Sequence, residues 1–268
     1  MRAGGVRRPA AAVSFYPGDP EELGAALDRL LAEASVRSAL GGPVGLVVPH
    51  AGYAYSGPVA ATAYRLLAES AAIPERVAVL GPAHFVPLGG VAVPEATGWE
   101  TPLGVVQIDV ELRERAVSQG AVVNDRPHAP EHAVEVQLPF LQRVVGSALR
   151  VLPVAVGTAE PEEVATLIEA LMRVPGTLVV VSTDLSHYHH HETARALDSR
   201  TAAAVVAGDL GAIGLDAACG AHALRGAVAY ASRRGLELHL LDLRTSADTA
   251  GGPSRVVGYG AFALIERT

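Results

Sequence analysis

Short runs of β-branched and other apolar residues alternate along this chain with longer stretches rich in alanine and leucine. The runs have the length and composition of buried strands. They cover residues 44–48, 77–80, 151–156, 178–181, 236–241 and 256–264. Strands that alternate with helices form a largely parallel sheet, because each crossover helix packs back onto the sheet. We therefore predict an α/β fold with a mostly parallel sheet and helices on both faces.

The intervening stretches have the spacing of amphipathic helices. They cover residues 21–40, 58–68, 161–174, 193–206 and 221–233. Pro58 and Pro161 open two of them, and a proline is tolerated in a first turn because the N–H there has no helical partner. A further helix follows Glu131, with Val134, Leu138, Leu141 and Val145 on its apolar face. Because it contains Pro139, we expect this helix to be kinked or to start late.

Residues 91–108 follow a different pattern, with short strands on either side of Thr101-Pro102-Leu103-Gly104. This pattern predicts a small hairpin at one edge of the sheet. The chain has no internal repeat, low-complexity tract or Pro/Ser-rich linker, so we expect residues 1–268 to form a single domain.

The composition limits the class of protein. Half of the residues are hydrophobic and 18% are charged, which favours a large core over disorder. The net charge of −7 argues against nucleic acid as a partner, and pairs such as Arg7-Arg8 indicate solvated faces. A single cysteine excludes an internal disulfide and favours a reducing compartment. No apolar segment approaches the ~20 residues of a membrane span, so we expect a cytoplasmic location.

Histidines follow several of the predicted strands, close to the point where each strand ends. His50, His84 and His187 lie in the loops after the runs at 44–48, 77–80 and 178–181. In an open α/β sheet, ligands bind beyond the carboxyl ends of the strands. Each histidine alone also fits a plain structural role at a strand end, but their equivalent placement indicates a shared site.

Cys219 lies just before the predicted helix at 221–233. A lone cysteine is most often a small buried hydrophobic residue. A helix N-terminus stabilises a thiolate, however, so this cysteine is well placed to bind a metal or to react. Two histidines and a thiolate would suit iron, copper or zinc, whereas Mg²⁺ and Ca²⁺ prefer oxygen ligands.

The stretch STDLSHYHHH holds four of the chain's ten histidines. His187 fits a general acid or base, with Asp184 orienting an imidazole or polarising a water; a helix cap beside an exposed histidine fits equally well. We expect His189, His190 and His191 to run into a helix, where consecutive side chains cannot all face one metal ion. These three are therefore predicted to be a polar helix start.

Glu131, His132 and Glu135 begin the segment that precedes Pro139. On a helix, residues 131 and 135, and residues 132 and 135, share a face. This arrangement favours a polar pocket wall around the site, to which we also assign Tyr53 at the end of the His50 loop. The alternative is negative charge that complements the first turn of a helix.

With these residues in view, the chain resembles the Memo family, also called AmmeMemoRadiSam system protein B, over nearly its whole length. The matching motifs are Arg8-Pro9-Ala10, Phe15-Tyr16-Pro17, Pro49-His50-Ala51-Gly52-Tyr53, Gly81-Pro82-Ala83-His84, Trp99, Thr101-Pro102-Leu103-Gly104, Glu131-His132, Leu138-Pro139, Ser182-Thr183-Asp184-Leu185-Ser186-His187 and Cys219-Gly220. One departure is Val13, where the family pattern has glycine.

The resemblance implies a fold similar to that of class III extradiol ring-cleaving dioxygenases, which hold non-haem iron with two histidines and a carboxylate. It implies that the metal ligands of this chain are His50, His84 and Cys219, and that Asp184 and His187 belong to the pocket. It further implies iron or copper, a metal-dependent redox activity on O₂ or a small molecule, and a functional association with a radical-SAM protein and an AMMECR1-like protein. Because a thiolate replaces the carboxylate, ring cleavage itself is not carried over.

The leading hypothesis is therefore a metal-dependent oxidoreductase with a mononuclear iron or copper centre. The alternatives are a non-catalytic module that binds a metal or a phosphopeptide, and a zinc hydrolase, which the ligand types also permit.

Overall fold

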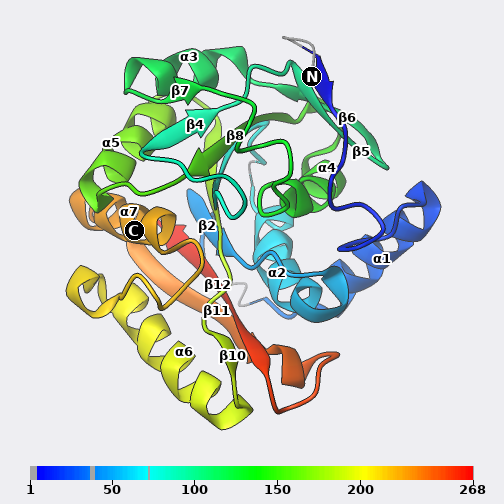
Figure 1. Ribbon diagram of the computed structural model, residues 1–268, viewed down its shortest axis with the longest axis vertical. Coiled ribbons are helices and arrows are strands. Elements are labelled where there is room, and N and C mark those ends of the chain that lie inside the picture. The colour runs from blue at the N-terminus through cyan, green and yellow to red at the C-terminus, as the bar shows by residue number, and fades with distance from the viewer. Residues whose placement is uncertain (1–4, 37–39, 72, 268) are drawn as a thin grey trace.

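A twisted sheet runs through the middle of the molecule, and the computed structural model describes it within residues 5–36, 40–71 and 73–267. In spatial order the main path is β1-β5-β6-β8-β3-β9-β2-β12-β10, with β11 beside β12, β4 beside β8, and β7 beside β4 (Figure 1). The strands are β1 (Val6–Arg7), β2 (Gly45–Val48), β3 (Arg76–Pro82), β4 (Val91–Val93), β5 (Gly98–Thr101), β6 (Gly104–Ile108), β7 (Val122–Val123), β8 (Arg150–Val156), β9 (Thr177–Ser182), β10 (His187–His189), β11 (Glu237–Thr245) and β12 (Val256–Ile265).

The central strands β6, β8, β3, β9 and β2 are parallel, whereas β12 pairs with β2, β11 and β10 in antiparallel fashion. The sheet is thus mixed but mostly parallel at its centre, as the alternation of strands and helices predicts. The predicted edge hairpin is present too: β5 and β6 are antiparallel, and Thr101 lies opposite Gly104.

Helices cover both faces of this sheet. They are α1 (Pro20–Glu33), α2 (Tyr53–Ala68), α3 (Val110–Ser118), α4 (Leu138–Val145), α5 (Pro161–Met172), α6 (His191–Ala207) and α7 (Ala221–Arg234). Successive side chains of a strand point to opposite faces. Accordingly Ala78 and Leu80 of β3 pack with α3, α5, α6 and α7, while Val77 and Val79 pack with α1, α2 and α4.

Two predicted helices have different bounds in the structure. The helix expected at 21–40 ends at Glu33, where Ala34 turns extended, and residues 37–39 lie outside the described part of the chain. A helix of 20 residues would extend ~30 Å in one direction. The chain instead turns back after Glu33 to enter β2 at Gly45, so the helix is shorter than predicted. α2 begins at Tyr53, so Pro58 lies inside the helix and not in its first turn. Burial of most of α2 against the sheet outweighs the hydrogen bond that Pro58 cannot donate.

The segment around Pro139 starts its helix late. Residues 131–134 are not helical, Glu135–Gln137 form a 3-10 turn, and α4 begins at Leu138. The predicted helical face shared by Glu131, His132 and Glu135 is therefore wrong. The predicted polar helix start is confirmed for two of the tandem histidines, since His190 is at the N-cap position of α6 and His191 is its first residue, but His189 ends the short strand β10.

Arg7 is buried and not solvated, which corrects the prediction for the Arg7-Arg8 pair. Its guanidinium lies 2.6 Å from Glu135 and 4.1 Å from the centre of the Trp99 ring. Glu135 is fully buried and also accepts hydrogen bonds from the Ala10 and Ala11 N–H groups and the Tyr16 hydroxyl. The N-terminal segment is thus fastened to the body of the protein by one buried ion pair.

Val13 has a φ of 73°, in the left-handed region that favours glycine, and its side chain is exposed. A β-branched residue is strained there by about 1–2 kcal/mol. Glycine also gains freedom in the unfolded chain, which offsets part of that gain. We predict that Val13→Gly raises the free energy of unfolding by about 0.5–1 kcal/mol, measured by urea denaturation. An unchanged or lower value would show that Val13 is not strained.

None of the described helices is long and apolar enough to cross a membrane.

Candidate metal centre

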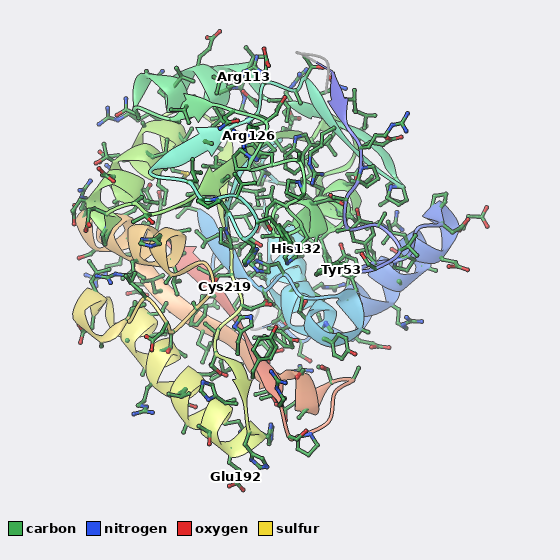
Figure 2. All side chains as sticks on the ribbon, viewed as in Figure 1. Tyr53, Arg113, Arg126, His132, Glu192 and Cys219 are labelled. Carbon is green, nitrogen blue, oxygen red and sulfur yellow. The ribbon has the colours of Figure 1, made fainter. Side chains whose placement is uncertain are left out.

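Loops from three elements bring His50, His84 and Cys219 together at the carboxyl edge of the sheet. His50 follows β2, His84 follows β3, and Cys219 precedes α7. Each residue offers one ligand atom, and these atoms lie within 4.8 Å of one another. Figure 2 shows Cys219 and His132 near the middle of the molecule, where these loops meet, whereas Arg113 and Glu192 lie on its periphery. The prediction that His50 and His84 share a site beyond the carboxyl ends of their strands is therefore confirmed in its geometry.

His50 is buried, and a serine hydroxyl orients its ring. The Ser182 Oγ lies 3.0 Å from His50 Nδ1 and donates its own proton to the Ala133 carbonyl at 2.6 Å. Because that carbonyl can only accept, His50 Nδ1 must donate to Ser182 Oγ. His50 Nε2 is thereby left without a proton, and it lies 3.2 Å from Cys219 Sγ. Burial, and next the neighbouring His84, lower the pKa of His50 to about 3, so the ring is neutral.

His84 is partly exposed, and a buried carboxylate orients its ring. Glu131 Oε1 lies 2.9 Å from His84 Nδ1, and Glu131 Oε2 accepts the His84 N–H at 2.7 Å. Glu131 also accepts the N–H groups of His132 and Ala133. Burial alone would raise the pKa of Glu131, but the hydrogen bond and charge of His84 and these backbone donors lower it to about 2. The carboxylate therefore holds the proton of His84 on Nδ1 and leaves Nε2 free.

Glu131→Gln should weaken metal binding about 10–100-fold, the usual cost of removing the charged partner of a metal-binding histidine. The reason is that glutamine keeps only one acceptor oxygen, so its NH₂ group must face either the three N–H donors that meet Oε1 or the His84 N–H that meets Oε2. The dissociation constant is measured by titration of metal-free protein with Zn²⁺. Glu162→Gln, at an exposed position on α5, is the matched control and should bind as the wild type does. Equal affinities for both variants would remove Glu131 from this role.

Cys219 is held against the loop of Asp184. The Asp184 N–H points at Cys219 Sγ at 3.3 Å, and the Cys219 N–H bonds to the Asp184 carbonyl at 3.2 Å. The next residue, Gly220, allows this approach, because a Cβ there would lie 2.8 Å from Thr183 Cβ. Burial, followed by the charge of Asp184, raises the pKa of the Cys219 thiol to about 12. The expected stabilisation of the thiolate by the helix N-terminus is therefore outweighed in the metal-free chain.

A third imidazole, His132, lies beside the first two. Its ring centre is 4.9 Å from that of His84 and 5.3 Å from that of His50. Burial, and next His50, lower the pKa of His132 to about 4. Phe15 packs 4.4 Å from the His132 ring and Phe85 5.9 Å from it. The mouth of the site is thus lined by aromatic rings on this side.

Asp184 and His187 also reach this edge of the sheet. Asp184 is buried, and its carboxylate accepts the backbone N–H of His50 at 2.7 Å, so it fixes the loop and not the imidazole. His187 Nδ1 lies 2.8 Å from the Leu185 carbonyl. Since a carbonyl can only accept, Nδ1 carries the proton and Nε2 of the neutral ring is free to take one up.

Two residues assigned to the pocket wall are directed elsewhere. The carboxylate of Glu135 is fully engaged by Arg7 and the N-terminal segment. The Tyr53 hydroxyl donates to the Val136 carbonyl, and its ring lines a different cavity, next to Phe15 and Tyr16. His189 and His190 are exposed, and His191 bonds to Thr245.

The set of donors fits one transition-metal ion. Ligand atoms 2.0–2.3 Å from a tetrahedral ion lie roughly 3–4 Å apart, so only a small contraction is needed here. Two imidazoles and a thiol that loses its proton suit iron, copper or zinc and do not suit Mg²⁺ or Ca²⁺. A second group of donors, His84, Glu131 and His132, shares His84 with the first.

Comparison with known proteins identifies the family of this chain. The family model of the Memo-like proteins matches residues 7–263. The chain belongs to this family.

Relatives within the family match this chain over more than two thirds of its length. A MEMO1 family protein of Methanopyrus kandleri is 38% identical over 282 residues, which cover 96% of this chain and 98% of that protein. One from Ignicoccus hospitalis is 36% identical, with 96% and 97% covered. One from Aquifex aeolicus is 40% identical over 72% of each chain.

A solved structure shares the fold. An uncharacterized protein of Escherichia coli K12 superposes with a TM-score of 0.56 at 13% identity, and the match covers 80% of this chain and 98% of that one. At this identity the likeness shows a common fold only.

Two residues that orient His50 were missed by the reasoning from sequence. Ser182 is the last residue of β9, and Gln137 donates both to Ser182 Oγ and to the Pro49 carbonyl. Ser182 carried a signal, since it stands at the same sheet edge as the histidines. Gln137 carried none, because its contacts span 45 and 88 residues of sequence.

Proposed function

We propose that this protein is a metal-dependent oxidoreductase with one iron or copper ion held by His50 Nε2, His84 Nε2 and Cys219 Sγ. The observation that carries the proposal is the matched orientation of the two rings. Ser182 and Glu131 each hold a proton on Nδ1, so both Nε2 atoms are free beside the thiol. A purely structural role for the histidines would not require this common tautomer.

When bound, iron or copper would supply one-electron redox chemistry with O₂ or a small-molecule substrate. The chain's own residues supply the rest. His187 would accept or donate a proton at Nε2, because its Nδ1 is committed to Leu185. Phe15 and Phe85 would keep water from one side of the site, and Glu131 would hold His84 in place while substrate binds.

Zinc would satisfy the same ligands, so the proposal of a redox metal rests on the family resemblance and needs a direct test. Metal-free protein is loaded anaerobically with Fe²⁺, Cu⁺ or Zn²⁺, and oxygen uptake is recorded with a reductant present. We expect uptake with iron or copper, none with zinc, and at least a tenfold loss in His187→Gln at unchanged metal content.

Two outcomes contradict the proposal. One is a rate that is the same in wild type and Cys219→Ser, which would mean that free metal is responsible. The other is an absence of uptake with every metal, together with peptide binding that persists in chelator, which would favour a binding module.

A further inference from the structure

Asp198 is a buried acid on α6 that belongs neither to the metal centre nor to any ion pair of the described residues. Its side chain is 1% exposed, and its Oδ1 accepts the backbone N–H of Ser186 at 3.0 Å. The Ser186 side chain also interacts favourably with this carboxylate. Burying a carboxylate is costly unless it is paired or hydrogen-bonded, so the contacts of Asp198 call for an explanation.

The backbone opposite is shaped to admit this carboxylate. Gly258 of β12 lies against it so closely that a Cβ there would overlap Asp198 Oδ2. Gly258 also accepts the Leu185 N–H and donates its own N–H to the Ser186 carbonyl, both at 2.8 Å. Leu185 and Ser186 are thus clamped between Gly258 on one side and Asp198 on the other.

These contacts hold Leu185 and Ser186, and Leu185 in turn determines the orientation and tautomer of the His187 ring. The Leu185 carbonyl accepts the proton on His187 Nδ1, and His187 directly follows Ser186. The next residue, Tyr188, has a φ of 63° and lies at a bulge in the pairing of β10 with β12. A non-glycine residue in this conformation stores strain and persists only where its neighbours hold it.

We infer that Asp198 is a positioning residue: it holds the Ser186 N–H and so fixes the loop that presents His187 with Nε2 free for proton transfer. The inference rests on the proposed function for the role of His187, but its geometry and its test do not need a metal. Asp198 does not touch the ligand residues, so its removal should leave metal binding intact.

The test reads the tautomer of His187 by ¹H–¹⁵N NMR of the histidine rings in metal-free protein, with His187→Gln used to assign the signal. In the wild type we expect the Nδ1–H tautomer. Asp198→Ala should convert it to a mixture of tautomers, and Asp198→Asn, which keeps an acceptor for the Ser186 N–H, should restore it. Gly258→Ala should reproduce the loss with every polar group still present.

Thr201→Val is the matched control, because Thr201 is also buried on α6 but bonds only within its helix. A loss of stability without a change of tautomer in Asp198→Ala would overturn the inference and leave Asp198 a merely structural residue. If that variant does not fold, Gly258→Ala decides, and a wild-type tautomer there would equally overturn it. Metal titration separates this test from the proposed function: Asp198→Ala should match the wild type, whereas Cys219→Ser should not.

Discussion

Replacing Cys219 by serine should lower metal affinity more than about 100-fold. Loss of a residue that only hydrogen-bonds to a metal ligand lowers affinity by up to about 100-fold, and loss of a ligand itself should cost more. The thiolate is the one anionic donor among the three candidate ligands, and serine keeps the size of the side chain but not the soft sulfur donor. Co²⁺ added to metal-free protein should give an intense near-ultraviolet sulfur-to-metal absorption in the wild type. That band should be absent in Cys219→Ser.

The control is a double variant, His189→Gln with His190→Gln, at two exposed positions of the histidine-rich stretch. It should bind Co²⁺ with wild-type affinity and absorption, because neither ring lies among the grouped ligand atoms. Loss of binding in this control with retention in Cys219→Ser would reverse the assignment and make the tandem histidines the site.

Replacing Arg7 by methionine should destabilise the protein by about 3–5 kcal/mol, the usual cost of leaving one member of a buried ion pair without its partner. Arg7 and Glu135 are 2% and 0% exposed, so solvent does not screen the charge that remains. Arg7 also donates to the carbonyls of His128 and Glu131, which would lose a donor. The free energy of unfolding is measured by urea denaturation at neutral pH.

Arg8→Met is the matched control, since Arg8 is the adjacent residue and is exposed. It should change the free energy of unfolding by less than about 0.5 kcal/mol, as is usual at surface positions. If the Arg7 and Arg8 variants were equally stable, the N-terminal segment would not be held by the ion pair. Metal affinity, measured below the unfolding transition, should be unchanged in Arg8→Met.

The part of the site that sequence can predict is the part fixed by strand ends. Parallel strands finish at one edge, so His50 and His84 are expected at the same edge of the sheet once β2 and β3 are recognised. Cys219 lies 169 residues from His50 in the chain and before a helix, so its approach depends on packing. Its position before a helix made it a candidate ligand, but only the resemblance to the Memo family joined it to His50 and His84 as one ligand set.

What sequence could not predict are the buried polar contacts between distant segments. Arg7 meets Glu135 across 128 residues, and Ser182 meets His50 across 132. Helical spacing placed Glu131 and Glu135 on one face, but the helix starts only at Leu138, so the two carboxylates serve different parts of the structure. Glu131 holds His84, whereas Glu135 holds the N-terminal segment.

The central claim is that His50, His84 and Cys219 hold one metal ion. Its most direct test is a crystal structure of anaerobically purified protein, recorded at the absorption edge of the metal that elemental analysis finds. We predict one anomalous peak, about 2.0–2.1 Å from both Nε2 atoms and about 2.3 Å from Cys219 Sγ. A peak bound by His84, Glu131 and His132 without Cys219, or no peak at either group, would contradict the claim.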